Sequence, residues 1–186
     1  VVVQQPDVNG CDGEVQGIIT FTSDTDPGTT YSWNVTNSAL LGMPSGSDAT
    51  NTIPSFTYAS NISGSDIVGV ATVTATENGC VSDVMSFTIT LKADPVVGLE
   101  ANQVVCAGDP VSTSFSANTG GGEVFSWTND NVLIGLPLNG VGDLAFNAAT
   151  NTTGAQIIAN ISVTATINGC TSTTPETFTI TIDPTP

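Results

Sequence analysis

Residues 73–80 read Val-Thr-Ala-Thr-Glu-Asn-Gly-Cys, and residues 86–91 read Ser-Phe-Thr-Ile-Thr-Leu. The stretch recurs as Val-Thr-Ala-Thr-Ile-Asn-Gly-Cys at residues 163–170 and Thr-Phe-Thr-Ile-Thr-Ile at residues 177–182. Apolar and polar residues alternate on both sides of each Asn-Gly, which predicts two β-strands with one buried face each. Asn-Gly supplies the positive φ that a tight reversal needs. Each copy is therefore predicted to be a β-hairpin with a cysteine directly after its turn.

The repetition extends over the whole chain of 186 residues. Tyr-Ser-Trp at residues 31–33 corresponds to Phe-Ser-Trp at residues 125–127, and Lys-Ala-Asp-Pro at residues 92–95 forms a short junction. This duplication predicts two domains, residues 1–93 and 94–186, each large enough for a modest core. Short strands separated by turn signals, without a helical period, predict an all-β fold of two tandem immunoglobulin-like β-sandwich domains.

Three local expectations follow from the first repeat. Residues 1–3, all valine, are expected to begin a strand, so the chain reads as a segment of a longer mature protein. Residues 6–13 are expected to be a turn region that contains Cys11. Residues 53–58 are expected to form one strand, matched by residues 144–148 of the second repeat.

The charge of the chain excludes several classes of partner. Seventeen acidic residues stand against one base, Lys92, which gives a net charge of −16. Nucleic acids and anionic membrane surfaces bind basic patches, so neither is an expected partner. No apolar run reaches the roughly 18 residues of a membrane span, so direct membrane insertion is not expected either.

Four cysteines occupy matched places in the two repeats. The loop cysteines, Cys11 and Cys106, precede the second strand of each repeat, and the hairpin cysteines, Cys80 and Cys170, follow each Asn-Gly. A metal site is the rival interpretation, but the chain has no histidine and no closely spaced cysteine pair. Disulfides in an exported protein are the preferred interpretation.

Two disulfide pairings remain open. Matched spacing favours one bridge inside each repeat, Cys11–Cys80 and Cys106–Cys170. Immunoglobulin topology favours another arrangement, because successive strands reverse and place the loop and the hairpin of one repeat at opposite ends. That topology brings Cys11 towards Cys170 and leaves Cys80 and Cys106 for neighbouring repeats.

The large aromatic residues have two interpretations. Trp33 and Trp127 are candidates for sugar-stacking platforms, but each lies at the same place in an alternating strand. A buried aromatic removes on the order of 150–250 Å² from water, so core anchors are the preferred interpretation. Phe87 and Phe178, in the last strand of each repeat, are assigned the same role.

Catalysis and metal binding have little support in the sequence. Without histidine or arginine the usual general base and oxyanion or phosphate clamps are missing, so the chain is not expected to be an enzyme. Calcium is the one ion considered, because hard cations take several oxygen ligands. Its weak candidate ligands lie in one loop and at the repeat ends: Asp24, Asp26, Asp94, Glu100 and Asp183.

A set of short motifs in the second repeat resembles the PKD-like, immunoglobulin-like repeats of Bacteroidota surface proteins. The motifs are Val-Val-Cys-Ala-Gly (104–108), Phe-Ser-Trp-Thr-Asn-Asp (125–130), Ile-Gly-Leu (134–136), Gly-Val-Gly-Asp (140–143), Thr-Asn-Thr (150–152), Thr-Ala-Thr-Ile-Asn-Gly-Cys (164–170) and Phe-Thr-Ile-Thr-Ile-Asp-Pro-Thr-Pro (178–186). The first repeat is a more divergent copy that lacks Thr-Asn-Asp after its tryptophan. In a bacterial protein, the four Asn-x-Ser/Thr sequons at Asn34, Asn61, Asn151 and Asn160 are then accidental products of composition.

This resemblance implies long arrays in adhesins exported by the type IX secretion system, the gliding adhesin SprB among them. It implies an extracellular place on the bacterial surface, neighbouring repeats of the same chain as partners, and glycan or protein ligands held by other domains. The expected function is a structural spacer for surface attachment or gliding. The alternatives are a carbohydrate- or protein-binding module, using the loop at residues 40–51 or 133–143, and an accessory domain of a secreted enzyme.

Overall fold

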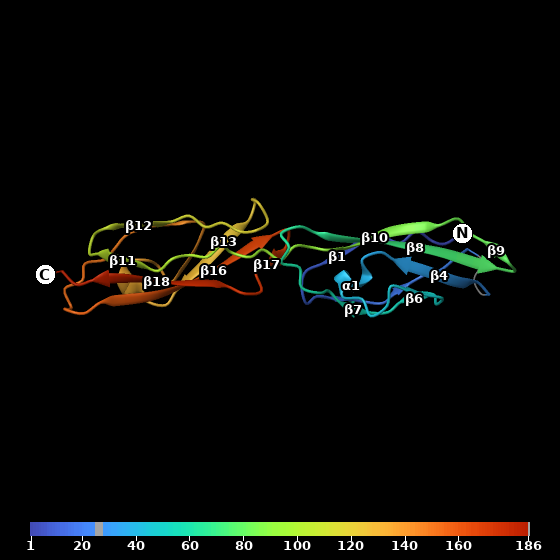
Figure 1. The fold of residues 1–186 in the computed structure, drawn as a ribbon, viewed down its shortest axis with the longest axis horizontal. Helices are drawn as coiled ribbons and strands as arrows, with labels where there is room; N and C mark the ends of the chain where they lie inside the picture. Colours follow the sequence, from blue (N-terminus) through green and yellow to red (C-terminus); the bar gives the residue numbers. More distant parts are fainter. Residues whose placement is uncertain (25–27, 186) are drawn as a thin grey trace. The chain divides into compact units, whose positions relative to one another are not determined.

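The chain divides into two compact units, Val1–Ala93 and Asp94–Pro186, at the position where the repeat pattern divides the sequence. The structure is a computed structural model that describes residues 1–24 and 28–185. Almost all of its regular structure is β, as the sequence predicts (Figure 1). Among the described residues, no helix has the length and apolarity that a membrane crossing requires.

Unit one is built on a six-stranded sheet whose central strand, β8, is the first arm of the repeated hairpin. The order is β1 (Val8–Gly10), β10 (Met85–Leu91), β8 (Ile67–Glu77), β4 (Thr30–Val35) and β5 (Ser47–Asp48), and β9 (Cys80–Val81) pairs with the end of β8. β1 runs parallel to β10, and the other pairs are antiparallel. The rest of the sandwich consists of β2 (Val15–Gln16) with β7 (Phe56–Thr57) and β3 (Ile19–Thr20) with β6 (Thr52–Ile53).

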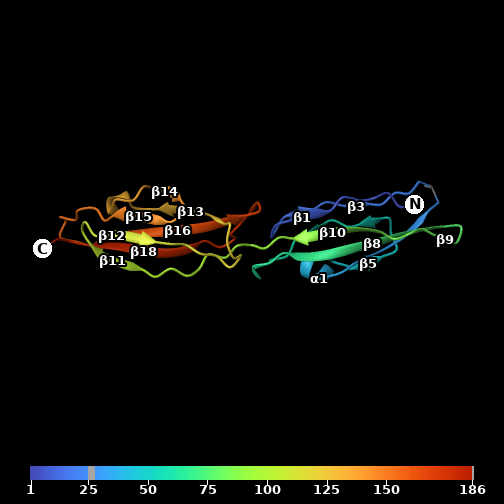
Figure 2. The same ribbon diagram turned by 90° about the horizontal axis from the view of Figure 1, so that it is seen from above.

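Unit two repeats this strand order (Figure 2). Its main sheet runs β11 (Gln103–Cys106), β18 (Glu176–Asp183), β16 (Ile157–Ile167), β13 (Val124–Asn129) and β14 (Asn139–Val141), with β17 (Cys170–Thr171) on the end of β16. β11 is again parallel to the last strand. β12 (Pro110–Thr113) pairs with β15 (Leu144–Asn147) away from this sheet.

The core of each unit is formed by the apolar residues that alternate with polar ones along its strands. In β4 every second residue is buried, and in β8 and β16 the apolar alternate positions lie inside. Trp33 and Trp127 are 2% and 7% exposed, and Phe87 and Phe178 are both 3% exposed. All four belong to the two apolar cores.

Three local expectations were wrong in detail. The residue 6–13 turn region contains β1, and residues 1–3 contribute only an isolated bridge from Val2 to Ser23. Residues 53–58 do not form one strand: β6 ends at Ile53 and β7 begins at Phe56, because Pro54 has no N–H to continue a ladder. Helical turns are present as α1 (Ser38–Leu41) and η1 (Val132–Ile134), which are too short to leave a helical period in the sequence.

A glycine contact in unit one gives a stability prediction. A Cβ added at Gly10 would lie 2.3 Å from Tyr58 Cε2, whereas one added at Gly17 meets nothing within 4 Å. Gly10→Ala is therefore expected to lower the unfolding free energy by about 1–3 kcal/mol through overpacking, and Gly17→Ala should stay within about 0.5 kcal/mol of wild type. Urea unfolding of both variants measures the difference, and equal midpoints would contradict the close contact.

Candidate functional site

The four cysteines are in two different chemical states. Cys11 and Cys170 are disulfide-bonded, whereas Cys80 and Cys106 are free and exposed. The proposed bridges inside each repeat, Cys11–Cys80 and Cys106–Cys170, are therefore wrong, since each of them needs one of the free thiols. The oxidised residues are thus one loop cysteine and one hairpin cysteine.

The loop cysteines are held by the same backbone contacts in both units. The N–H of Cys11 donates to Glu14 Oε2 at 2.9 Å, and the N–H of Cys106 donates to Asp109 Oδ2 at 3.2 Å. In return the Glu14 N–H donates to the Cys11 carbonyl, and the Asp109 N–H to the Cys106 carbonyl. The glycine before each acidic residue has a positive φ, 75° at residue 13 and 82° at residue 108. Both loops therefore hold the backbone of their cysteine by the same two hydrogen bonds.

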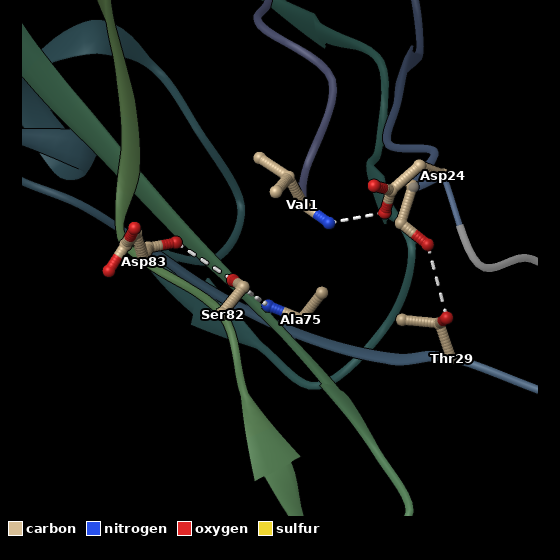
Figure 3. A network of polar contacts seen from close by, with 7 residues as sticks. Val1, Asp24, Thr29, Ala75, Ser82 and Asp83 are labelled. Atoms are coloured by element: carbon tan, nitrogen blue, oxygen red, sulfur yellow. Dashed lines mark hydrogen bonds and ion pairs between the residues drawn. The ribbon is translucent and has the colours of Figure 1, made fainter.

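The hairpin cysteines also share one frame. Asn78 and Asn168 adopt φ values of 49° and 51°, as the two-residue turn requires. Beyond the turn, the Ala75 N–H donates to Ser82 Oγ at 3.0 Å, and the Ala165 N–H donates to Ser172 Oγ at 2.9 Å. Figure 3 shows the first of these contacts, together with the bond from Ser82 Oγ to the Asp83 carbonyl. The serine hydroxyl fixes the strand that carries the cysteine in each unit.

The calcium candidates that the structure describes have separate hydrogen-bond partners. Asp94 is 3% exposed and accepts a hydrogen bond from Thr173 Oγ1 at 2.8 Å. Asp183 accepts from Gln156 Nε2, and Asp24 pairs with the Val1 amino group (Figure 3). Asp26 lies outside the described residues. Within residues 1–24 and 28–185, no three metal-binding side chains come together.

Glu100 lies beside a second carboxylate. Its backbone N–H donates to Glu176 Oε1 at 3.2 Å. Burial, and after it the negative charge of Glu176, raises the pKa of Glu100 above its ordinary value of 4.5. Elsewhere in unit two a hydrogen bond from the Thr119 hydroxyl lowers the pKa of Glu123. The two glutamates therefore affect stability with opposite signs.

Replacing Glu100 by glutamine is expected to remove a small loss of stability at neutral pH. The native state keeps the Glu100 proton to a higher pH than the unfolded chain does, so the unfolding free energy falls as the pH rises from 4.5 through the raised pKa. The Glu100→Gln variant should therefore gain in melting temperature relative to wild type across that window. Glu123→Gln should show the opposite trend, with its deficit disappearing at low pH; parallel curves for both variants would contradict the assignment.

Two of the four sequons have a structural role that the sequence did not reveal. Asn151 is fully buried, and its Nδ2 donates to the carbonyls of Ala155 and Ile182 at 2.8 and 3.0 Å. Its Oδ1 accepts from the N–H and the hydroxyl of Thr153. Asn61 is 2% exposed and makes the same four bonds, through Ser63, Ser65 and Leu91. We call each arrangement an asparagine clasp; the signal was the recurrence of Asn-x-Ser/Thr at matched places.

The departure of the first repeat from the Thr-Asn-Asp motif has a structural explanation. In unit two, Asn129 is 3% exposed, and its Nδ2 bonds the carbonyls of Leu136 and Pro137. Val35 holds the equivalent last position of β4 and is buried as an apolar residue. The bond that follows is kept in both units: Asn37 Nδ2 donates to the Val68 carbonyl, as Asn131 Nδ2 donates to the Ile158 carbonyl.

A groove lies over the tryptophan in unit two. It has a volume of about 340 Å³ and is lined by β13, β14 and β16, with Trp127, Gly140 and Val141 among its residues. β14 approaches the indole so closely that a Cβ at Gly140 would lie 2.2 Å from Trp127 Cζ2. Among the described residues, nothing accepts a hydrogen bond from buried Trp127 Nε1, whereas Trp33 Nε1 donates to Thr50 Oγ1 at 3.4 Å.

The chain matches no protein-family model and no curated protein. Among solved structures it is similar to DIP-gamma IG1+IG2, with 9% identity, a TM-score of 0.50 and coverage of 96% of this chain and 94% of that one. Human protocadherin-24 EC1-2 aligns at 11% identity and a TM-score of 0.42, covering 90% and 87%. The fold is two immunoglobulin-like β-sandwich domains.

Proposed function

We propose that this chain is a pair of structural spacer repeats from an extracellular adhesin on a bacterial surface, of the kind that the type IX secretion system exports. The observation that carries the proposal is the repetition of one framework. The strand order β1-β10-β8-β4-β5 returns as β11-β18-β16-β13-β14. Trp33 pairs with Val73 in the register in which Trp127 pairs with Val163.

The repeated framework suits an array because each unit has its own core. One apolar cluster forms the core of residues 1–93, and a second forms the core of residues 94–186. The folding stability of a longer array is therefore set repeat by repeat. The acidic surface, with a net charge of −16, keeps neighbouring filaments apart. The proposal assigns adhesion and any catalysis to other domains.

Small-angle scattering tests the spacer proposal. We expect the maximum dimension of a direct two-copy fusion to be about twice that of the single chain, because reach in an array comes from repetition. A glycan and protein array should show no specific binding by the single chain. A two-copy fusion hardly longer than one copy would contradict the proposal.

A binding module is the second candidate, because the segment from η1 to β14 exposes aliphatic side chains. Leu133, Leu138 and Val141 are 65%, 57% and 73% exposed, and Val141 also lines the groove over Trp127. If this segment binds a ligand, the single chain should give a specific signal on a glycan or protein array. The Val141→Ser variant should lose that signal, and the Val15→Ser variant should keep it. Val15 is a matched control because it is 71% exposed in the other unit.

A further inference from the structure

We propose that the open edge of β14 in unit two binds an extended, basic segment of a partner protein, which adds to the main sheet as a further strand. β14 is the last strand of that sheet, and among the described strands it pairs with β13 alone (Figure 2). An edge strand offers a row of backbone N–H and C=O groups with which a second chain can pair. The inference rests on the binding-module candidate above and names the chemistry of its partner.

The register of β14 on β13 shows which of its backbone groups face outwards. The Gly142 N–H donates to the Phe125 carbonyl at 2.9 Å. In an antiparallel pair the inter-strand bonds use every second residue of each strand, so Gly140 also faces β13. The N–H and C=O groups of Asn139 and Val141 therefore point to the open side of β14.

The open side of β14 lacks the capping that the corresponding strand of unit one has. In β5 the outward position is held by Ser47, because the residue before it, Gly46, accepts from the Val35 N–H of β4 at 2.7 Å. Ser45 Oγ donates to the Ser47 carbonyl at 2.8 Å and accepts from the Ser47 N–H at 3.4 Å. Within residues 1–24 and 28–185, no group bonds the outward N–H and C=O groups of β14. Since exposed edges invite pairing and are commonly capped or covered, the edge of unit two is the one available to a partner.

The surface beside this edge is firmly held and partly apolar. Gly140 lies against the Trp127 ring, so β14 is fixed on the core and loses little freedom when a partner binds. Val141 is 73% exposed and lines the groove of about 340 Å³ together with serine and threonine side chains of β13 and β16. A β-branched side chain on an added strand would pack against Val141 as a cross-strand pair.

The charge of unit two favours a basic partner over a second copy of the chain. Residues 94–186 contain eight acidic residues and no basic one, and exposed Asp143 follows Val141 by two positions. A second copy would bring another net charge of −16 and be repelled, whereas lysine or arginine side chains are attracted. The occupant is therefore an extended segment that alternates β-branched and polar residues and carries basic residues at its ends.

Titration calorimetry of the full chain with the peptide Lys-Thr-Val-Thr-Val-Thr-Lys tests the proposal. We expect binding that weakens as the salt concentration rises, because salt screens the attraction between charges. The peptide with glutamate in place of both lysines should bind at least about tenfold more weakly. The basic peptide with all its internal amides N-methylated has no N–H groups to pair with the edge, so its binding should be lost.

Val141→Pro tests the role of the edge from the protein side. Proline removes the outward N–H of residue 141 and leaves the bonds from β14 to β13 in place, and edge strands tolerate it. We expect the affinity for the basic peptide to fall at least about tenfold. Val141→Thr is the matched control: it keeps the N–H and the branched side chain, so it should bind within about threefold of wild type. Circular dichroism and thermal melting establish that both variants are folded, and the N-methylated peptide tests the edge without any change to the protein.

Three outcomes would overturn the proposal. The first is equal affinity of wild type and Val141→Pro, or of the N-methylated and unmodified peptides. The second is equal affinity for the basic and acidic peptides. The third is a dimer of the chain, seen by sedimentation and abolished by Val141→Pro, without peptide binding, which would assign the edge to a second copy.

Failure of strand addition is distinguishable from failure of the binding module. A glycan signal that Val141→Ser abolishes, without binding of the basic peptide, retains the module and rejects strand addition. The scattering of the two-copy fusion tests the spacer proposal independently of both.

Discussion

Replacing Asn151 by alanine is expected to lower the unfolding free energy of unit two by about 3–5 kcal/mol, since several buried polar groups lose their partners together. The carbonyls of Ala155 and Ile182 lose their donor, and the N–H and hydroxyl of Thr153 lose their acceptor. Chemical unfolding monitored by Trp127 fluorescence reports the change, because this is the single tryptophan of unit two.

Asn160→Ala is the control for this clasp. Asn160 begins another Asn-x-Ser/Thr sequon of the same unit, is exposed, and donates from Nδ2 to Asp130 Oδ2 at 2.6 Å. Its loss should change the unfolding free energy by less than about 1 kcal/mol. If the two variants unfold alike, the buried hydrogen bonds of Asn151 do not stabilise the unit as we infer.

Truncation of either tryptophan is expected to have an equally large effect. Trp33→Ala and Trp127→Ala should each lower the unfolding free energy of their own unit by about 3–5 kcal/mol, because each leaves a cavity in an apolar core. Each variant retains the tryptophan of the other unit, so fluorescence reports whether the untouched unit keeps its unfolding midpoint. Calorimetry of the same sample then shows the transition of the altered unit.

The phenylalanine variants separate packing from recognition. Trp33→Phe and Trp127→Phe keep most of the buried ring and should lose clearly less stability than the alanine variants. A sugar-stacking role predicts the reverse pattern, in which alanine variants stay stable and lose ligand binding. Exposures of 2% and 7% favour packing at both positions.

The features that the sequence predicted are those set by local periodicity. Alternation around each Asn-Gly predicted the paired arms of β8 and β10 and of β16 and β18, together with the burial of Phe87 and Phe178. These predictions succeed because one buried face fixes which residues of a strand point inwards. The same argument placed both tryptophans in the cores.

The features that the sequence did not predict depend on groups distant in the chain. The state of a cysteine depends on which thiol lies opposite it, and matched spacing wrongly suggested bridges inside each repeat. The asparagine clasps close on Leu91 and Ile182, about 30 positions after the asparagines. A sequon pattern describes only three residues, so it cannot show that the amide is buried.

The parallel pairing of the first strand with the last determines how a repeat carries tension. β1 pairs with β10 from Val8–Ile89 to Gly10–Leu91, and β11 pairs with β18 from Gln103–Ile180 to Cys106–Asp183. A pull on the two ends of a unit drags these neighbouring parallel strands past each other lengthwise, so their hydrogen bonds are strained together. An antiparallel terminal pair would instead peel open one bond at a time. Each repeat is thus closed by a shear clamp placed where the load enters and leaves it.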